Sequence, residues 1–317
     1  MNVGLQILFT WLINGLYQNR LKLIVERFVQ AEGTSRKLNI PENYEEHFGK
    51  LGQYLLIVNG GWFILIIVNI VGLSGFPDYN ASLWTSYNLL RIPSFNSVTT
   101  FLWSILVVKR KFYRLNEKVR FLMVPFRNKS FVLEENACSE LIRNSKHSPA
   151  ALPDTIDAIS QHRRNLIKVT KMVKRHFDFL VLLCIVAHMP TCVVNIYLAY
   201  KTVKEDEPMT GSNWFYTFSY ICWFFFPIFT LLVISNVCGS TTNEANETGN
   251  VLHAMLNGQG NFGDSREVAK FNMFSLELLQ NPVEMSLFGF VDLNHWMVYK
   301  VLTTAITYLV IMLQFYN

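Results

Sequence analysis

The last long apolar stretch of the chain reads WMVYKVLTTAITYLVIMLQFY at residues 296–316. A helix needs about 20 mostly apolar residues to cross about 30 Å of hydrocarbon, because all its backbone amides must be satisfied within the segment. This stretch has that length, and Lys300 is its one ionised side chain. It therefore predicts a transmembrane helix.

Five other stretches of the sequence are apolar enough to cross a membrane. They are residues 2–17, 51–73, 83–108, 178–200 and 214–238. The composition agrees, because 51% of the 317 residues are hydrophobic and only 16% are charged, where soluble domains carry about 25% charge. We predict an all-α fold, a polytopic transmembrane helix bundle of six spans with helices extended into the cytoplasm.

Two prolines, Pro190 and Pro227, lie inside predicted spans. Proline removes one hydrogen bond from a helix, and in lipid a neighbouring helix or a local readjustment can satisfy the freed carbonyl. We expect bends at these positions and no helix ends.

The basic residues indicate how the chain is oriented in the membrane. Residues 18–50, 109–177 and 239–295 together hold 24 of the 28 Lys and Arg residues. Short loops rich in these residues stay in the cytoplasm. We therefore place these three segments in the cytoplasm and predict a multi-pass protein of the plasma membrane with an extracellular C-terminus.

With six spans the N-terminus would also lie outside. The sequon Asn80-Ala81-Ser82 falls in a loop assigned to the outside, which makes Asn80 a candidate glycosylation site. An outside N-terminus is unusual without a signal peptide, and the first residues lack the pattern of one. We expect one further span to precede Met1.

The spans and loops divide the chain into five segments. They are 1–108 with three spans and a cytoplasmic loop, 109–177 as a cytoplasmic helical segment, 178–238 with two spans, 239–295 with cytoplasmic helices, and 296–317 with the last span.

Apolar residues at helical spacing predict helices in the cytoplasmic segments. The longest such series predicts one helix that begins near Asp154 and continues into the fourth span, and it consists of Ile156, Ile159, Leu166, Val173 and Phe177. Another helix is expected after the triplet 109–111, and two more at 243–256 and 266–280.

No motif for catalysis, metal binding or nucleic-acid binding stands in a plausible context. The glycine-rich segment 258–263 lacks the Gly-Lys-Ser/Thr ending of a phosphate loop and follows no predicted strand, so we interpret it as a linker. The seven histidines have no metal-ligand spacing, and the basic residues form no localised face. We expect no enzyme activity, no cofactor, no metal and no nucleic-acid partner.

The end of the last span carries the pattern Thr307-Tyr308, five apolar residues, then Gln314-Phe315. This pattern resembles the C-terminal signature of the insect gustatory receptors. The resemblance covers residues 271–315, because three further matches stand upstream at similar offsets: Leu279-Gln280-Asn281-Pro282, Phe288-Gly289-Phe290 and Asp292-Leu293.

The resemblance implies a seven-span taste chemoreceptor for a small-molecule tastant. It also implies that four copies, alike or mixed with other family members, form a ligand-gated, non-selective cation channel around the last helix. Sugar-receptor members resemble one another in carrying Glu directly after the Thr-Tyr pair, and here that place holds Leu309. A sugar ligand is therefore less expected.

The polar end of the last span fits two interpretations. An unsatisfied Gln314 side chain in lipid would cost about 2 kcal/mol or more, so it either meets water at the outer interface or faces an axis shared by several copies. The resemblance favours the second, with Gln314 and Phe315 as the gate. Thr307, Val310 and Ile311 would line the pore beside them.

Tyr308 is expected to have a structural role, with its hydroxyl bonded across helices. For the tastant we expect a pocket between the spans, with aromatic walls and a few polar groups. The candidates are Tyr87, Arg91, His188, Asn195, Trp214, Tyr220 and Trp223. Arg91 stands out because a buried guanidinium needs a partner and no acidic residue lies in its own predicted span or in the preceding span 51–73.

Three alternatives stay open: a G-protein-coupled type of receptor, a secondary transporter, and a shortened family member that does not conduct.

Overall fold

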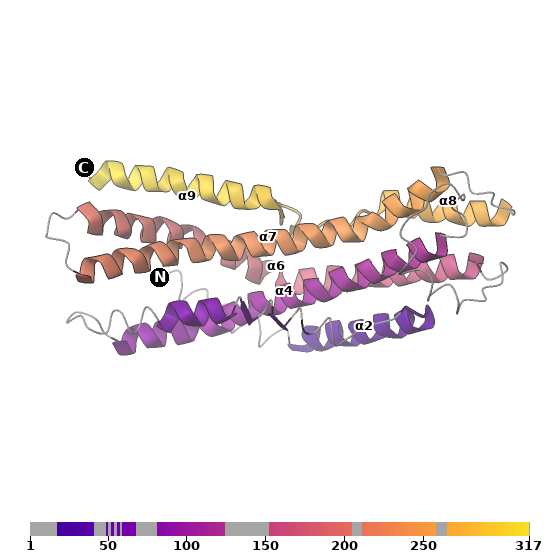
Figure 1. Cartoon of the computed structure of the whole chain (residues 1–317), viewed down its shortest axis with the longest axis horizontal. Helices are drawn as coiled ribbons and strands as arrows, with labels where there is room; N and C mark the ends of the chain where they lie inside the picture. The colour runs from indigo at the N-terminus through magenta and orange to yellow at the C-terminus, as the bar shows by residue number, and fades with distance from the viewer. Residues whose placement is uncertain are drawn as a thin grey trace, which may run out of the picture.

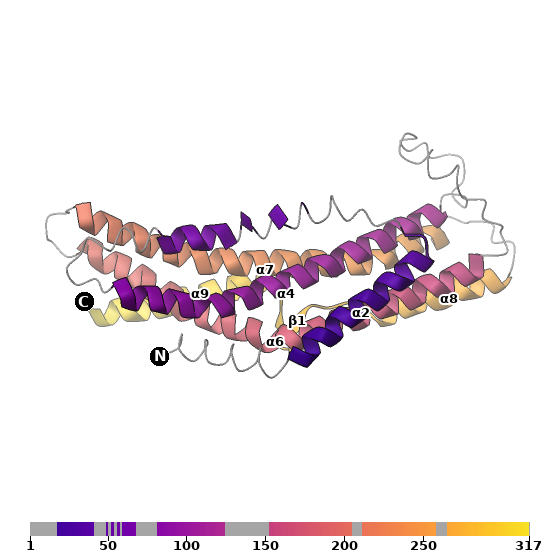
Figure 2. The same cartoon turned by 90° about the horizontal axis from the view of Figure 1, so that it is seen from below.

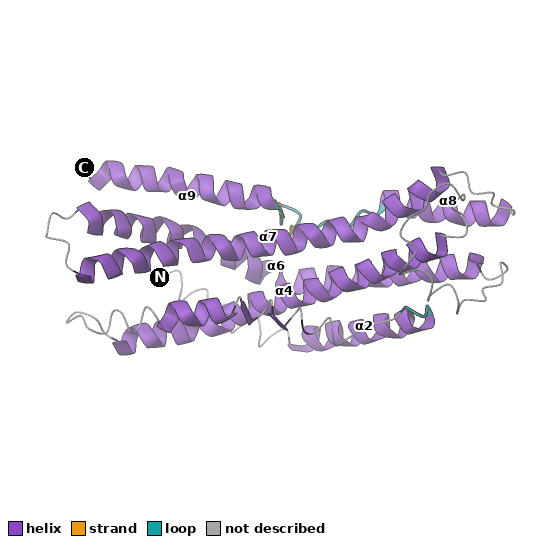
Figure 3. Cartoon of the chain, in the orientation of Figure 1, coloured by secondary structure: helices purple, strands orange, loops and turns teal. Residues whose placement is uncertain are grey.

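The computed structural model describes residues 18–40, 49, 52–53, 56–57, 59–67, 81–123, 152–204, 211–257 and 265–316. Within them the chain forms long helices that lie side by side along one axis, together with one short hairpin (Figures 1 and 3). The elements are α2 (Gln18–Lys37), α4 (Ala81–Met123), α6 (Leu152–Lys204), α7 (Gly211–Asn257), α8 (Ser265–Gln280), β1 (Ser286–Leu287), β2 (Val291–Asp292) and α9 (His295–Tyr316). The predicted all-α membrane bundle is confirmed.

Three helices are much longer than a membrane is thick. Helices α4, α6 and α7 contain 43, 53 and 47 residues. At 1.5 Å per residue they extend roughly 65–80 Å, more than twice the hydrocarbon thickness of about 30 Å. Each long helix therefore has a part that can lie in lipid and a part that projects beyond it.

The molecule accordingly has two halves along its long axis (Figures 1 and 2). The half that we call the membrane half contains α9 and the apolar parts of the long helices, residues 81–108, 178–204 and 211–238. The other, the polar half, contains α2, α8 and the remaining parts of α4, α6 and α7.

Three described helices, α6, α7 and α9, are long and apolar enough to cross a membrane. They contain the predicted spans 178–200, 214–238 and 296–316. The predicted span 83–108 lies inside α4. Residues 2–17, most of 51–73 and the predicted linker 258–263 lie outside the described residues.

The boundaries between spans and cytoplasmic helices differ from expectation. Helix α4 does not end at the basic triplet 109–111, because Ile105, Val108, Phe112 and Leu115 form one stripe that is 0% exposed on both sides of it. The helix expected after that triplet is therefore the end of α4. The helix expected at 243–256 is likewise the end of α7.

Two other predictions about helix continuity are confirmed. Helix α6 runs from the polar half into the membrane half without a break, and all five residues of the predicted apolar series are buried. Pro190 and Pro227 lie inside α6 and α7.

A hairpin that the sequence did not suggest connects α8 to α9. Strands β1 and β2 pair antiparallel, and the amide of Phe290 donates to the carbonyl of Leu287 at 2.9 Å. The turn places Phe288 at φ 50° and Gly289 at φ 79°. Side chains disfavour this region of φ, so the turn requires a residue such as Gly289.

The segment between α8 and α9 is fastened to α6 and α7. The amide side chain of Asn246 accepts from the backbone N–H of Val283 at 2.9 Å and donates to its carbonyl at 3.0 Å. Lys174 donates to the hydroxyl of Ser286 at 3.2 Å. Helix α9 therefore starts from a fixed point at the boundary between the two halves.

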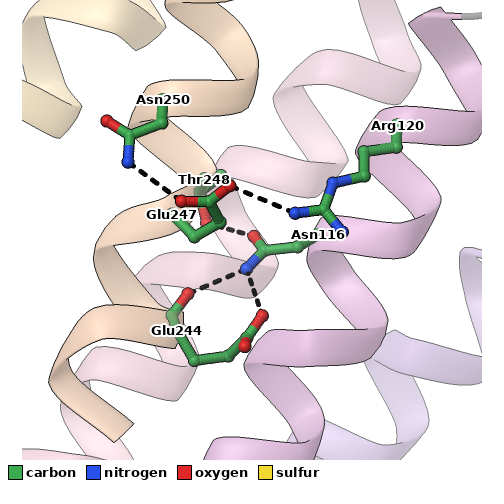
Figure 4. A network of polar contacts seen from close by, with 6 residues as sticks. All are labelled: Asn116, Arg120, Glu244, Glu247, Thr248 and Asn250. Atoms are coloured by element: carbon green, nitrogen blue, oxygen red, sulfur yellow. Dashed lines mark hydrogen bonds and ion pairs between the residues drawn. The ribbon is translucent and has the colours of Figure 1, made fainter. Parts of the chain in front are cut away.

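A polar network joins α4 to α7 in the polar half (Figure 4). Asn116 is 0% exposed. Its carbonyl oxygen accepts from the hydroxyl of Thr248 at 2.6 Å, and its amide nitrogen donates at 2.8 Å to both the backbone carbonyl and the carboxylate of Glu244. At the rim Arg120 pairs with Glu247 at 3.1 Å. Because every polar atom of the buried Asn116 side chain is bonded, the network fixes how α4 lies against α7.

Candidate functional site

The membrane half contains a cavity between α4, α6, α7 and the helical segment 59–67. The space open to the centres of water molecules is about 50 Å³. The lining residues are Trp62, Phe95, Val98, Cys184, His188, Thr191, Trp223, Phe226, Pro227 and Thr230. Those on α6 and α7 lie near the middle of the predicted spans 178–200 and 214–238, which corresponds to mid-depth of a bilayer that these spans would cross.

Aromatic rings form most of the cavity wall. Trp62 stacks on Phe95 with ring centroids 4.9 Å apart and planes 9° apart. Phe95 and Trp223 both contact the ring of Phe226, with centroids 6.2 Å apart in each pair. Flat rings held against one another in this way leave a slot with apolar faces, which suits a small apolar molecule.

Two threonine hydroxyl groups in the wall already donate their hydrogens to backbone carbonyls. Thr191 donates to the carbonyl of Ala187 at 2.8 Å, and Thr230 donates to the carbonyl of Phe226 at 3.0 Å. A hydroxyl group has one hydrogen and two lone pairs. Toward the cavity, both oxygens can therefore act only as hydrogen-bond acceptors.

The imidazole in the wall is held by its own helix. The Nε2 atom of His188 lies 3.4 Å from the sulfur of Cys184, one turn earlier on α6. Cys184 is buried and does not form a disulfide. The pair places one titratable ring beside the aromatic slot.

Of the seven predicted ligand residues, the structure brings His188 and Trp223 together in this cavity. Asn195 donates to the carbonyl of Thr191 on its own helix at 2.7 Å. Trp214 is 63% exposed, and Tyr220 stacks with Tyr216. None of these three lines the cavity.

The side chains of Tyr87 and Arg91, like Asn80, lie outside the described part of the chain. Sequence reasoning missed Trp62, Phe95, Thr191 and Thr230 as cavity residues. One signal was available, since both threonines stand close to the helix prolines Pro190 and Pro227.

Helix α9 presents a polar stripe that no described part of the chain covers. Thr303, Thr307 and Gln314 recur at spacings of four and seven and are all exposed, whereas Leu309 and Leu313 are half-buried toward the bundle. The hydroxyl of Thr307 donates to the carbonyl of Thr303 at 2.9 Å. Thr303 extends the polar face that the sequence predicted from the other two residues.

The other predicted residues of α9 are also exposed on the single chain. Their exposed fractions are 55% for Tyr308, 48% for Val310, 41% for Ile311 and 87% for Phe315. Within the described part of the chain, the Tyr308 side chain therefore points away from the bundle.

A small apolar cluster links the cavity to α9. Cys192 and Val193 of α6 and Ala305 of α9 are buried together, with Phe224 and Ile228 of α7 packed against them. Each of the α6 and α7 members is a chain neighbour, or next neighbour, of a cavity residue. A change in the cavity that rotates α6 or α7 must therefore move the surface that contacts Ala305.

With this geometry in place, the comparisons with known proteins are informative. The sequence profile of the 7tm chemosensory receptor family matches residues 5–316, so the chain belongs to that family. A stretch of 126 residues, 39% of this chain, is 24% identical to the gustatory and pheromone receptor 32a of Drosophila melanogaster, and it covers 25% of that receptor.

The chain is therefore a member of a family of membrane chemoreceptors, and the resemblance of its last span to the gustatory receptors is confirmed at the level of the family.

Proposed function

We propose that the chain is a taste-receptor subunit of a tetrameric, ligand-gated, non-selective cation channel in the plasma membrane, with its C-terminus outside. The observation that carries this proposal is the exposed polar stripe of α9, formed by Thr303, Thr307 and Gln314. In lipid the Gln314 amide would be poorly satisfied, whereas around a shared axis the whole stripe would line a path for water and ions.

The rest of the exposed surface supports the same arrangement. On α7 the residues Phe218, Phe225 and Phe229 are 56%, 58% and 48% exposed along one face, which suits contact with lipid. Trp296 and Tyr299 are exposed at the start of α9, where an aromatic belt would meet the headgroups.

Helix α8 supports assembly into an oligomer. Its buried face, Phe271, Phe274 and Leu278, packs against the same chain, while Met273, Leu276 and Leu279 are 72%, 55% and 65% exposed. This helix belongs to the polar half, where lipid is not available to cover an apolar face. Further copies of the chain, or longer members of the family, would cover it in a homo- or heterotetramer.

The cavity is the proposed tastant site, and the cluster around Ala305 is the proposed route from that site to the last helix. Gln314 and Phe315 form the proposed gate, because a ring of amides can bond one another when closed and an aromatic ring can exclude water.

The test is basal current in excised patches without nucleotide. Replacing Gln314 or Phe315 by Ala is expected to change the basal current or the ion selectivity, while Leu309→Ile on the inward side of α9 is expected to leave both unchanged. A current that requires nucleotide and G protein would favour the G-protein-coupled alternative. No current at all in any condition would leave a non-conducting member.

A further inference from the structure

The chemistry of the cavity wall restricts what the proposed tastant site can hold. This inference rests on the proposal that the cavity is the ligand site, and it concerns the class of ligand. Three features of the wall decide it: its charge, its hydrogen-bonding groups and its volume.

The wall has no carboxylate, ammonium or guanidinium group among the described residues. The cavity lies at mid-depth in the bilayer, where an ion without a partner is costly. The described wall offers a charged ligand no carboxylate, ammonium or guanidinium partner, and this favours an uncharged ligand.

The hydroxyl groups of the wall accept hydrogen bonds and do not donate them. Thr191 and Thr230 each give their hydrogen to a carbonyl of their own helix, and each keeps lone pairs that can face the cavity. An acceptor left without a donor in an apolar site is unfavourable. The matching ligand therefore carries a donor, such as a hydroxyl group.

The volume limits the size of the ligand. A cavity of about 150 Å³ holds benzene, and one water-sized sphere needs about 10–15 Å³. The space of about 50 Å³ in this cavity corresponds to roughly two non-hydrogen atoms on the benzene scale and to roughly three to five on the scale of water-sized spheres. A short alkanol of up to about five non-hydrogen atoms is therefore the largest alcohol that this space admits.

We propose that the cavity between Trp62, Phe95, Trp223 and Phe226 binds small uncharged alcohols, with the hydroxyl of the ligand donating its one hydrogen to the oxygen of either Thr191 or Thr230. The alkyl chain lies in the aromatic slot, and an isomer without a donor binds less tightly.

The need for a donor is tested with two isomers, 1-butanol and diethyl ether. They have the same atomic composition, and only the alcohol carries a hydrogen-bond donor. A diazirine analogue of 1-butanol is photolysed with the purified protein in lipid nanodiscs, and labelled peptides are identified by mass spectrometry. Each isomer is then titrated as a competitor of labelling at the segments 184–191 and 223–230.

We expect labelling in these segments and about fivefold stronger competition by 1-butanol than by diethyl ether, the effect of one neutral hydrogen bond. The double variant Thr191→Val and Thr230→Val keeps the shape of both side chains and is expected to abolish that difference. Thr202→Val is the matched control, because Thr202 bonds Leu198 in the same way outside the cavity. The ratio of competition by 1-butanol to competition by diethyl ether is compared between the variants, because any difference in how the two isomers partition into lipid is the same for each variant.

Equal competition by the two isomers, with labelling still in the cavity, would overturn the proposed ligand class and leave the cavity as a ligand site. Preferential competition that survives in the double variant would overturn the role of the two threonines. Labelling found only elsewhere on the protein would overturn the ligand class and the cavity site together. The comparison in the unaltered protein does not depend on whether any variant folds.

Discussion

The network around Asn116 allows the effect of a single hydroxyl group to be predicted in detail. Replacing Thr248 by Val keeps the shape of a fully buried side chain and removes the donor that lies 2.6 Å from the Asn116 carbonyl oxygen. Asn116 is itself 0% exposed, so water cannot replace this donor. An unsatisfied buried acceptor costs about 1–3 kcal/mol, so Thr248→Val should destabilise the fold by that amount.

A second substitution tests the reason for this cost. In Asn116→Leu the backbone carbonyl and the carboxylate of Glu244 each lose the bond from the Asn116 amide, but the Thr248 hydroxyl can then donate to that carbonyl, four residues earlier on its own helix. When both positions are apolar, no orphaned acceptor remains on the side chain of residue 116. The double variant should therefore be less destabilised than the sum of the two single variants, by about 1 kcal/mol or more.

The assay is thermal or denaturant unfolding of the purified protein in detergent. Asn250→Ala is the control, because Asn250 bonds Glu247 at the exposed rim of the same network and should change stability by less than about 0.5 kcal/mol. Two results would contradict a role of the network in holding α4 against α7. One is a Thr248→Val variant that loses no more stability than Asn250→Ala, and the other is a double variant whose loss of stability equals the sum of the two single losses.

Three further predictions follow from other parts of the structure. Ala305→Leu places a larger side chain in the cluster between α6, α7 and α9, which should destabilise the fold by about 1–3 kcal/mol and push α9 toward the proposed shared axis. Its basal current in patches should therefore fall, while Ile306→Leu on the exposed side should not change it. Burial, together with the charge of Lys111, lowers the pKa of His162 from its ordinary value of 6.5 to about 4. The neutral imidazole therefore contributes its full stabilisation above pH 6.5, and this contribution is lost as the pH falls from 6.5 to 4. Unfolding at pH 5 should be easier than at pH 7 by roughly 2 kcal/mol, and His162→Gln should remove this dependence. Cross-linking in membranes should capture the proposed oligomer. Met273→Glu in the exposed face of α8 should abolish the cross-linked species, whereas Gln30→Glu on α2 adds the same charge beside Arg27 and should leave it intact.

The sign of the His162 effect follows from its contacts. The hydroxyl of Thr34 gives its hydrogen to the carbonyl of Ala31 at 2.7 Å, so it accepts from the Nδ1–H of His162, also at 2.7 Å. The buried Nε2 atom has no partner among the described residues. Protonation would place a charged N–H there without an acceptor. The pKa of His162 is therefore lower in the folded state than in the unfolded chain.

Length and hydropathy were enough to predict where three of the spans lie, because a helix in lipid needs about 20 apolar residues whatever its neighbours are. Periodicity also predicted the buried face of α6 in the polar half, where Leu166 and Val173 are 0% exposed. The ends of α4 and α7 were harder to predict. A change from apolar to basic residues marks a membrane boundary, but it does not end a helix whose buried stripe continues.

The cavity depends on the rotation of each helix, and packing against other helices decides this rotation. Trp214 and Trp223 stand on the same helix, yet one is 63% exposed and the other 9%. Arg163 and Arg164 are adjacent, and only Arg164 reaches Glu277, at 3.4 Å, while Arg163 is 1% exposed. Sequence alone ranks the members of such pairs equally, and of the five predicted ligand residues whose side chains the structure describes, two line the cavity.

The central claim is that the polar stripe of α9 lines an ion pathway shared by several copies. A cysteine scan from residue 303 to residue 315, read as block of current by an aqueous thiol reagent, tests it most directly. We predict block at Thr303→Cys, Thr307→Cys and Gln314→Cys, and no block at Leu309→Cys or Leu313→Cys on the inward side. Block confined to the two leucines, or a current unaffected at all positions, would contradict the claim.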